Sequence, residues 1–165
     1  MMSDSTPEII AELKRHGVSD VDDSNLTRAI YSSDASLYRV VPQVVVRPRD
    51  LDEVQAVVAA CFDTATPLTS RGAGTSIAGN AIGTGVVMDF SKHLNRVLAI
   101  DPTTSTAQVE PGVVHARLQA ASRPMALRYG PDPSTHTRCT VGGMIANNAC
   151  GNRALGYGRS SDNIS

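Results

Sequence analysis

Apolar residues recur at helical spacing in the N-terminal part of the chain. Residues 7–16 place isoleucines and a leucine on one side of a helix and are followed by a glycine, which predicts a first helix. A second, shorter helix is predicted through Leu26–Ile30, with Asp23 or Ser24 as its N-cap. Residues 32–42 are less regular, and we expect them to enter the core as an extended segment.

From Val44 onward, short β-branched runs alternate with segments of helical spacing. The runs predict strands at 44–46, 67–70, 86–90, 97–100 and 106–110. The helical spacing predicts helices at 51–65, where Asp50 is the N-cap, at 113–122 and at 141–149. This order of elements is typical of an α+β fold, an α/β sandwich in which helices flank a mixed sheet.

Composition and charge narrow the class of protein. Apolar residues make up 41% and charged residues 19% of the 165 residues, as in an ordinary globular fold. The net charge of −1 gives no general attraction to nucleic acid or to an anionic membrane, and we expect no transmembrane segment because every apolar stretch is too short. The N-terminus lacks a secretory signal, and the three cysteines form no CxxC pair, so we expect a reduced, cytoplasmic protein.

The glycines are not spread evenly along the chain. Five of the 13 glycines fall between Gly72 and Gly85, and five more fall between Gly142 and Gly158. Glycine that is concentrated in two short stretches indicates that the backbone there comes close to a bulky ligand.

The first glycine-rich segment, SRGAGTSIAGNAIGTG, spans Ser70–Gly85. Gly72 and Gly74 allow successive N–H groups to turn toward one point, as in a backbone nest that binds phosphate oxygens. Nearby hydroxyl, guanidinium and amide groups add donors: Thr75, Ser76, Arg71 and Asn80. A strand follows the loop where a Rossmann loop would lead into a helix, and no Walker A lysine is present. We therefore expect the loop itself to hold phosphates, and a flexible hairpin connection is the alternative that spacing leaves open.

The second glycine-rich segment runs from Tyr129 to Arg159. It begins with a stiff turn at Pro131–Pro133 and continues through Gly142–Gly143 into a helix of small residues and two asparagines. Such a surface suits a flat, partly apolar ring with a polar edge. The alternative is a glycine-rich turn that precedes a packed helix.

Four motifs in this order resemble a known family: Pro42–Val58, Ser70–Ala81, Val109–Val113 and Pro131–Arg159. The chain is similar to FAD-linked oxidases of the vanillyl-alcohol-oxidase and p-cresol-methylhydroxylase (PCMH) type, over about residues 32–165. Within them it most resembles the D-lactate, glycolate and D-2-hydroxyglutarate dehydrogenases. The resemblance implies a PCMH-type FAD-binding domain in which the first loop holds the pyrophosphate and the second segment lines the rest of the flavin site.

The residues that the resemblance assigns to FAD lie in both segments. They are Arg71, Gly72, Ala73, Gly74, Thr75, Ser76, Gly79, Asn80, Ala81, Pro131, Asp132, Thr140, Gly142, Gly143, Ala146, Asn147 and Asn148. Family members that attach FAD covalently through the first loop have a histidine where this chain has Thr75, so the FAD is expected to be non-covalent.

We expect an N-terminal helical extension at 1–40 and an FAD-binding domain at 41–165, truncated at its C-terminal end. The resemblance implies a dehydrogenase of a D-2-hydroxy acid whose full-length form takes that small-molecule substrate and an electron acceptor, in the cytoplasm or peripherally at a membrane. The catalytic residues are unknown, since in the family they lie beyond this segment, and the segment alone is expected to be inactive. The alternatives are an alcohol or aldonolactone oxidase, or a nucleotide-binding module without activity.

No metal site is predicted. The residues His115, His136, Cys139 and Cys150 fit no common zinc spacing, and no iron–sulfur ligation pattern occurs. His93 is expected at the surface.

Overall fold

The computed structural model describes residues 6–165, which divide into two compact units. The first ends at His93, and the second is Leu94–Ser165. No helix within residues 6–165 combines the length and the apolar character needed to cross a bilayer. The predicted domains, 1–40 and 41–165, describe a different division and stay predictions.

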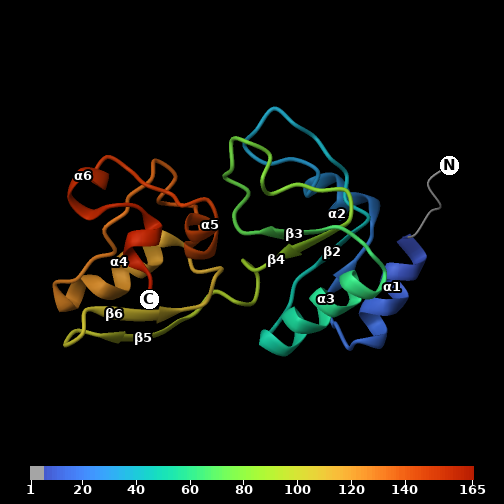
Figure 1. Cartoon of the computed structure of the whole chain (residues 1–165), viewed down its shortest axis with the longest axis horizontal. Coiled ribbons are helices and arrows are strands. Elements are labelled where there is room, and N and C mark those ends of the chain that lie inside the picture. Colours follow the sequence, from blue (N-terminus) through green and yellow to red (C-terminus); the bar gives the residue numbers. More distant parts are fainter. Residues whose placement is uncertain (1–5) are drawn as a thin grey trace. The chain divides into compact units, whose positions relative to one another are not determined.

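The first unit is built on a four-stranded sheet with the strand order β1-β2-β4-β3; β2, β3 and β4 are labelled in Figure 1. The strands are β1 (Val21–Asp22), β2 (Val44–Val46), β3 (Leu68–Arg71) and β4 (Val86–Asp89). β1 pairs antiparallel with β2, whereas β2 and β3 both run parallel to β4, so the predicted mixed sheet is confirmed.

Helices α1 (Thr6–Arg15) and α3 (Leu51–Asp63) lie side by side and pack on one face of this sheet (Figure 1). The core between them contains Ile9 and Leu13 of α1, Val57 of α3, and alternate valines of the strands. Burying such side chains stabilises the unit by about 1.5–3 kcal/mol each. Helical spacing therefore indicated the buried face of α1, but only part of that of α3, where Val57 is buried and Leu51 and Val58, at the same spacing, are exposed.

Local signals set the helix boundaries in this unit. The Asp50 carboxylate accepts a hydrogen bond from the Glu53 amide at 2.9 Å and begins α3, as predicted. Ser24, one of the two predicted caps, begins α2 (Asn25–Ile30) by accepting a bond from Thr27 at 3.3 Å. Gly17 ends α1 with a φ of +83°, which other residues rarely adopt.

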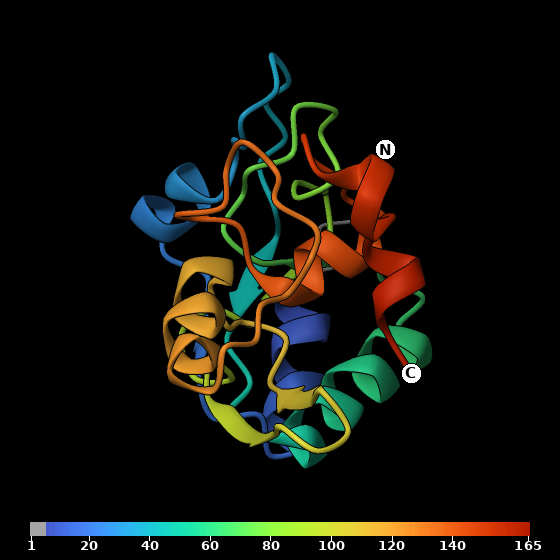
Figure 2. The same cartoon turned by 90° about the vertical axis from the view of Figure 1, so that its left-hand side faces the viewer.

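The second unit contains a hairpin and short helices that long loops connect (Figure 2). Its elements are β5 (Val97–Asp101), β6 (Thr106–Val109), α4 (His115–Ser122), a 3₁₀ turn η1 (Arg123–Met125), α5 (Val141–Ala146), α6 (Ala154–Tyr157) and a 3₁₀ turn η2 (Ser160–Asn163). β5 and β6 pair antiparallel, as predicted. α5 is shorter than the predicted 141–149, because Asn147 caps it and Asn148 turns into the left-handed region at φ 45°. β1, α6 and the 3₁₀ turns were not predicted.

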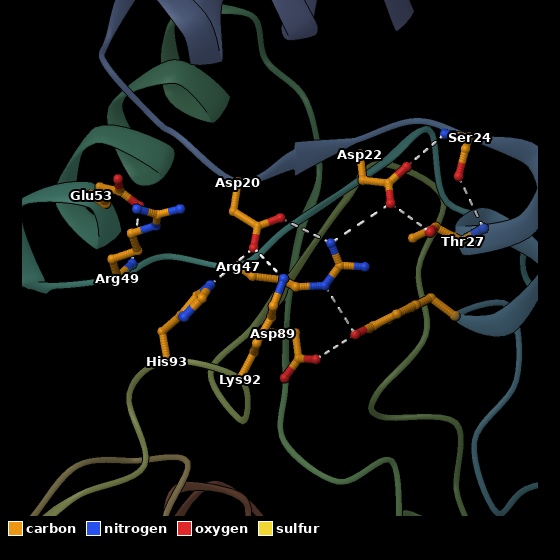
Figure 3. Close-up of polar contacts among 11 residues, drawn as sticks. Asp20, Asp22, Ser24, Thr27, Arg47, Arg49, Glu53, Asp89, Lys92 and His93 are labelled. Carbon is orange, nitrogen blue, oxygen red and sulfur yellow. Dashed lines mark hydrogen bonds and ion pairs between the residues drawn. The ribbon is translucent and has the colours of Figure 1, made fainter.

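Charged side chains converge at the carboxyl ends of β2 and β4 in the first unit (Figure 3). The Asp20 carboxylate accepts hydrogen bonds from Arg47 Nη1 at 3.0 Å, Lys92 Nζ at 2.7 Å and His93 Nε2 at 2.9 Å. The Asp20 side chain is only 15% exposed. His93, expected at the surface, is thus partly buried in this cluster, because an acidic partner distant in sequence holds it.

Replacing Asp20 by asparagine should remove about 2 kcal/mol of stability at pH 7. Burial alone would raise the pKa of this carboxyl, but the hydrogen bonds from Lys92, His93 and Arg47 outweigh it and lower the pKa from 3.8 to about 2. Because the folded-state pKa is depressed, the stabilisation is complete above pH 3.8 and disappears as the pH falls through 2.

Urea unfolding from pH 7 to pH 2 measures this effect. The difference in unfolding free energy between the wild-type protein and Asp20→Asn should shrink as the pH falls. Asp23 is exposed and lies three residues away, and the variant Asp23→Asn removes the same charge, so it serves as the control. Identical pH profiles for the two variants would show that the Asp20 ion pairs do not stabilise the fold.

Candidate functional site

The first glycine-rich loop leaves the sheet at the carboxyl end of β3. There Arg71 is in register with Asp89, the last residue of the parallel strand β4. In open parallel sheets, ligands bind at the carboxyl ends of the strands. The chain after Arg71 therefore stands at the edge of the sheet where a cofactor is expected.

The backbone of this loop exposes a run of hydrogen-bond donors. Within the described part of the chain, the N–H groups of residues 73–77 donate to no protein acceptor. Gly74 and Gly79 have φ values of +65° and +78°, so the chain turns there through the left-handed region. The Ser76 hydroxyl accepts the amides of Ala78 and Asn80, both at 3.2 Å, and closes the following turn. The arrangement suits an anion with several oxygens.

Arg71 lies at the base of the loop with its guanidinium turned into the protein. Nη1 donates to the Ala81 carbonyl at 2.9 Å, and Nη2 donates to the Ser33 carbonyl at 3.0 Å. The guanidinium carbon lies 5.0 Å from the centre of the Tyr31 ring. Its hydrogen bonds therefore join both ends of the loop to the segment that precedes β2.

The second glycine-rich segment belongs to the second unit and is held by its own polar groups. The Thr140 hydroxyl accepts from the Gly143 amide at 3.3 Å and caps α5. Asp132 accepts from the Arg153 amide at 3.2 Å and forms an ion pair with its side chain. Asn148 accepts from the Ser161 amide at 3.0 Å.

Close backbone contacts explain two glycines of this unit. A Cβ atom at Gly142 would lie 2.8 Å from Pro111 Cβ, and one at Gly151 would overlap the Asp132 carbonyl. Contacts with other protein atoms therefore require glycine at both positions.

The predicted cofactor residues thus form two groups. Those from Arg71 to Ala81 lie in one loop of the first unit, whose ends the Arg71 side chain joins. Those from Pro131 to Asn148 lie in the second unit, at Pro131–Asp132, where the predicted turn is replaced by one at residues 134–138, and on α5 with its flanking residues. Their contacts with FAD stay predictions.

A pair of side chains on α4, not predicted from the sequence, holds the start of the second segment. His115, which is 2% exposed, has its Nε2 atom 2.9 Å from the Pro131 carbonyl. Gln119 accepts the Tyr129 amide at 3.0 Å and donates to the Tyr129 carbonyl at 2.8 Å. Burial lowers the pKa of His115, which favours the neutral ring. The spacing of four between the two residues, which places them on one helix face, was the available signal.

One group of ligand-type atoms within residues 6–165 lies elsewhere in the first unit. Glu12, His16 and Asp63 place one ligand-type atom each within 4.8 Å of one another. Arg15 donates to the same Glu12 carboxylate. We interpret the group as an ion-pair cluster that joins α1 to the end of α3.

Comparison with known proteins shows which sequences and structures this chain resembles. A family model described as an FAD binding domain matches residues 42–165. The chain is 38% identical over 151 residues to the glycolate oxidase subunit GlcD of Bacillus subtilis, covering 90% of this chain and 32% of that protein. It is 34% identical over 162 residues to the D-2-hydroxyglutarate dehydrogenase of Pseudomonas putida, covering 96% of this chain and 16% of that protein.

A solved structure shows the same fold. The structure of an alkyldihydroxyacetonephosphate synthase superposes with a TM-score of 0.83 at 25% identity, covering 94% of this chain and 33% of that one. The chain therefore spans about a third or less of the length of each of these proteins.

Proposed function

Because the chain belongs to the family of FAD binding domains, whose model matches residues 42–165, we propose that it binds FAD with both glycine-rich segments in an enzyme that oxidises a D-2-hydroxy acid. The first loop, Arg71–Ala81, holds the pyrophosphate. The predicted residues of the second segment, from Pro131 to Asn148, line the remainder of the flavin.

The observation that carries this proposal is the row of N–H groups at residues 73–77, which donate to no acceptor among residues 6–165. A pyrophosphate offers several charged oxygens, and each N–H bond to a charged group contributes about 1.5–3 kcal/mol. The segment 71–81 contains no aspartate or glutamate that would repel these oxygens. The donors of the loop therefore fit the group that they are proposed to bind.

The cofactor and the protein have separate roles in this proposal. When bound, FAD supplies the acceptor for the hydride that leaves the substrate α-carbon. The residues of this chain bind the cofactor and fix its position. No residue of this chain is assigned as the base that takes the hydroxyl proton.

The class of substrate is supported by the names of the relatives, a glycolate oxidase subunit and a D-2-hydroxyglutarate dehydrogenase. Both names describe oxidation of a hydroxyl group next to a carboxylate. We propose glycolate, D-lactate or D-2-hydroxyglutarate as the substrate of the full-length protein, with a separate electron acceptor as its second partner.

Anaerobic reduction of the bound flavin tests the function. The purified full-length protein should absorb in the blue, and adding one of these three acids should bleach that band, whereas L-lactate should not. Bleaching by a simple alcohol or an aldonolactone alone would favour the other oxidase class. A colourless protein that takes up no FAD would exclude the flavoenzyme proposal.

We predict that the FAD of this protein is not covalently attached through the first loop. Thr75 stands where a histidine would be needed, and a threonine hydroxyl at neutral pH is a weak nucleophile. Precipitating the yellow protein with acid should leave the flavin in the supernatant. Colour that stays with the washed pellet would contradict this prediction.

A further inference from the structure

Residues 31–38, which precede the part of the chain matched by the family model, lie against the first loop. The Ala35 amide donates to the Gly74 carbonyl at 3.1 Å, in the middle of the loop. The Ala81 amide, at its end, donates to Asp34 Oδ2 at 3.3 Å. With the bond from Arg71 to the Ser33 carbonyl, this segment contacts the beginning, the middle and the end of the loop.

Tyr31 links the same segment to the sheet. Its hydroxyl donates to Asp89 Oδ2 at 2.5 Å, and Asp89 is only 4% exposed. The guanidinium carbons of Arg71 and Arg47 lie 5.0 and 5.4 Å from the centre of its ring. The Tyr31 ring is therefore held in place, and the Arg71 guanidinium lies over its face. Burial, followed by the hydrogen bond to Asp89, raises the pKa of Tyr31, so the hydroxyl stays a donor at neutral pH.

Arg71 is packed against the loop backbone. Both of its terminal nitrogens donate to main-chain carbonyls. A Cβ atom at Gly74 would lie 2.5 Å from Nη2 and 3.0 Å from the guanidinium carbon. The positive φ and the missing side chain of Gly74 thus allow the loop to fold directly over Arg71.

We propose that residues 31–38 and Arg71 act as a positioning element that holds the first loop in the conformation presenting the N–H groups of residues 73–77. In this role Arg71 acts on the backbone of the loop and makes no direct bond to phosphate. The inference rests on the proposed function, since it assumes that this loop binds the FAD pyrophosphate.

The physical reason is the conformational freedom of the loop. Five glycines between Gly72 and Gly85 give the unfolded segment many accessible conformations, and ordering it on binding would lower the affinity for FAD. Hydrogen bonds at three points along the loop order it before FAD binds, so less conformational entropy is lost on binding.

Two variants of Arg71 separate a positioning role from a phosphate contact. Lysine keeps the charge but cannot bridge two carbonyls while stacking on a ring, and glutamine removes the charge. We expect Arg71→Lys and Arg71→Gln to weaken FAD binding by a similar factor, about tenfold or more, with the same salt dependence as the wild-type protein. FAD titrations of the full-length apoprotein, followed by flavin fluorescence at several salt concentrations, measure both quantities. Near-wild-type affinity in Arg71→Lys with a reduced salt dependence in Arg71→Gln would overturn the proposal.

Variants within residues 31–38 test whether this segment positions the first loop. Tyr31→Leu and Asp34→Ala should each weaken FAD binding by about tenfold, and Tyr31→Phe, which keeps the ring, should weaken it less. Val57→Ala, in the core of the same unit, is the matched control. It should lower the melting temperature while leaving the FAD dissociation constant unchanged at a temperature where every variant is folded.

The outcomes distinguish this inference from the proposed function. If Tyr31→Leu and Asp34→Ala bind FAD as tightly as Val57→Ala while Gly74→Ala does not bind it, the positioning role is wrong and the loop assignment stands. If Gly74→Ala also binds FAD normally, the loop does not hold the pyrophosphate, and the proposed function of this segment fails with it.

Discussion

Replacing Gly74 by alanine should lower the affinity of the full-length protein for FAD by about a hundredfold or more. Gly74 has a φ of +65°, and an added Cβ would lie 2.5 Å from Arg71 Nη2. The Arg71 guanidinium would have to move aside, which breaks its bonds to the Ser33 and Ala81 carbonyls, and alanine is strained at this φ, so we expect the loop to lose the conformation that presents its N–H groups. Losing two such charge-assisted bonds, at about 1.5–3 kcal/mol each, corresponds to at least that factor.

The chain offers a matched control at Gly17. Its φ of +83° imposes the same left-handed backbone, but a Cβ there would meet nothing within 4 Å. Gly17→Ala should therefore show the backbone strain, about 1–3 kcal/mol of lost stability, without a change in FAD affinity. An FAD titration of both variants below their melting temperatures checks the difference. Equal affinities would mean that the first loop is only a connection between strands.

Replacing Gly151 by alanine should destabilise the second unit by about 1–3 kcal/mol, the usual effect of overpacking. The new Cβ would overlap the Asp132 carbonyl and lie 2.5 Å from Asp132 Oδ1. A backbone group cannot move aside as a flexible side chain does, so the backbone at Asp132 must shift. Because Pro131 and Asp132 are predicted to line the flavin, FAD affinity should fall as well.

Gly156→Ala is the control for this second variant. Gly156 lies in α6, and a Cβ there would meet nothing within 4 Å. Alanine in a helix is more favourable than glycine by about 0.5–1 kcal/mol, so this variant should be as stable as the wild-type protein or slightly more stable. Urea unfolding of both variants measures the effect. A Gly151→Ala protein as stable as Gly156→Ala would show that the chain relaxes around the contact without cost.

Local order was predictable because its causes lie within a few residues of each other in sequence. The cap at Asp50, the helical spacing of α1 and α3 and the β-branched run Val44–Val46 each act over one or two turns or along one strand. Both glycine-rich segments were also recognisable in the sequence, because a chain that turns tightly or approaches another group closely needs glycine itself. The resemblance to FAD-linked proteins could also be recognised from the sequence, because the short motifs that carry it contain these glycines.

The direction of the polar side chains was not predictable from these patterns. Arg71 was expected to add a donor for phosphate, and in the structure its guanidinium donates to the carbonyls of Ser33 and Ala81. His93 was expected at the surface, and it is bound to Asp20, which lies 73 positions earlier. Residues 32–42 were predicted only as an entry to the core, and part of this stretch contacts the first loop.

Most helices and strands, though not β1 or α6, could thus be predicted from the sequence alone, together with the two glycine-rich segments and the family to which they point. The partners of the charged and aromatic side chains, in contrast, follow from the three-dimensional arrangement of the elements. The strand order β1-β2-β4-β3 brings Asp20, Arg47 and Asp89 together and places Tyr31 beside Arg71. That order depends on the packing of the whole sheet under α1 and α3, and hydrophobic patterning within any one segment carries no information about it.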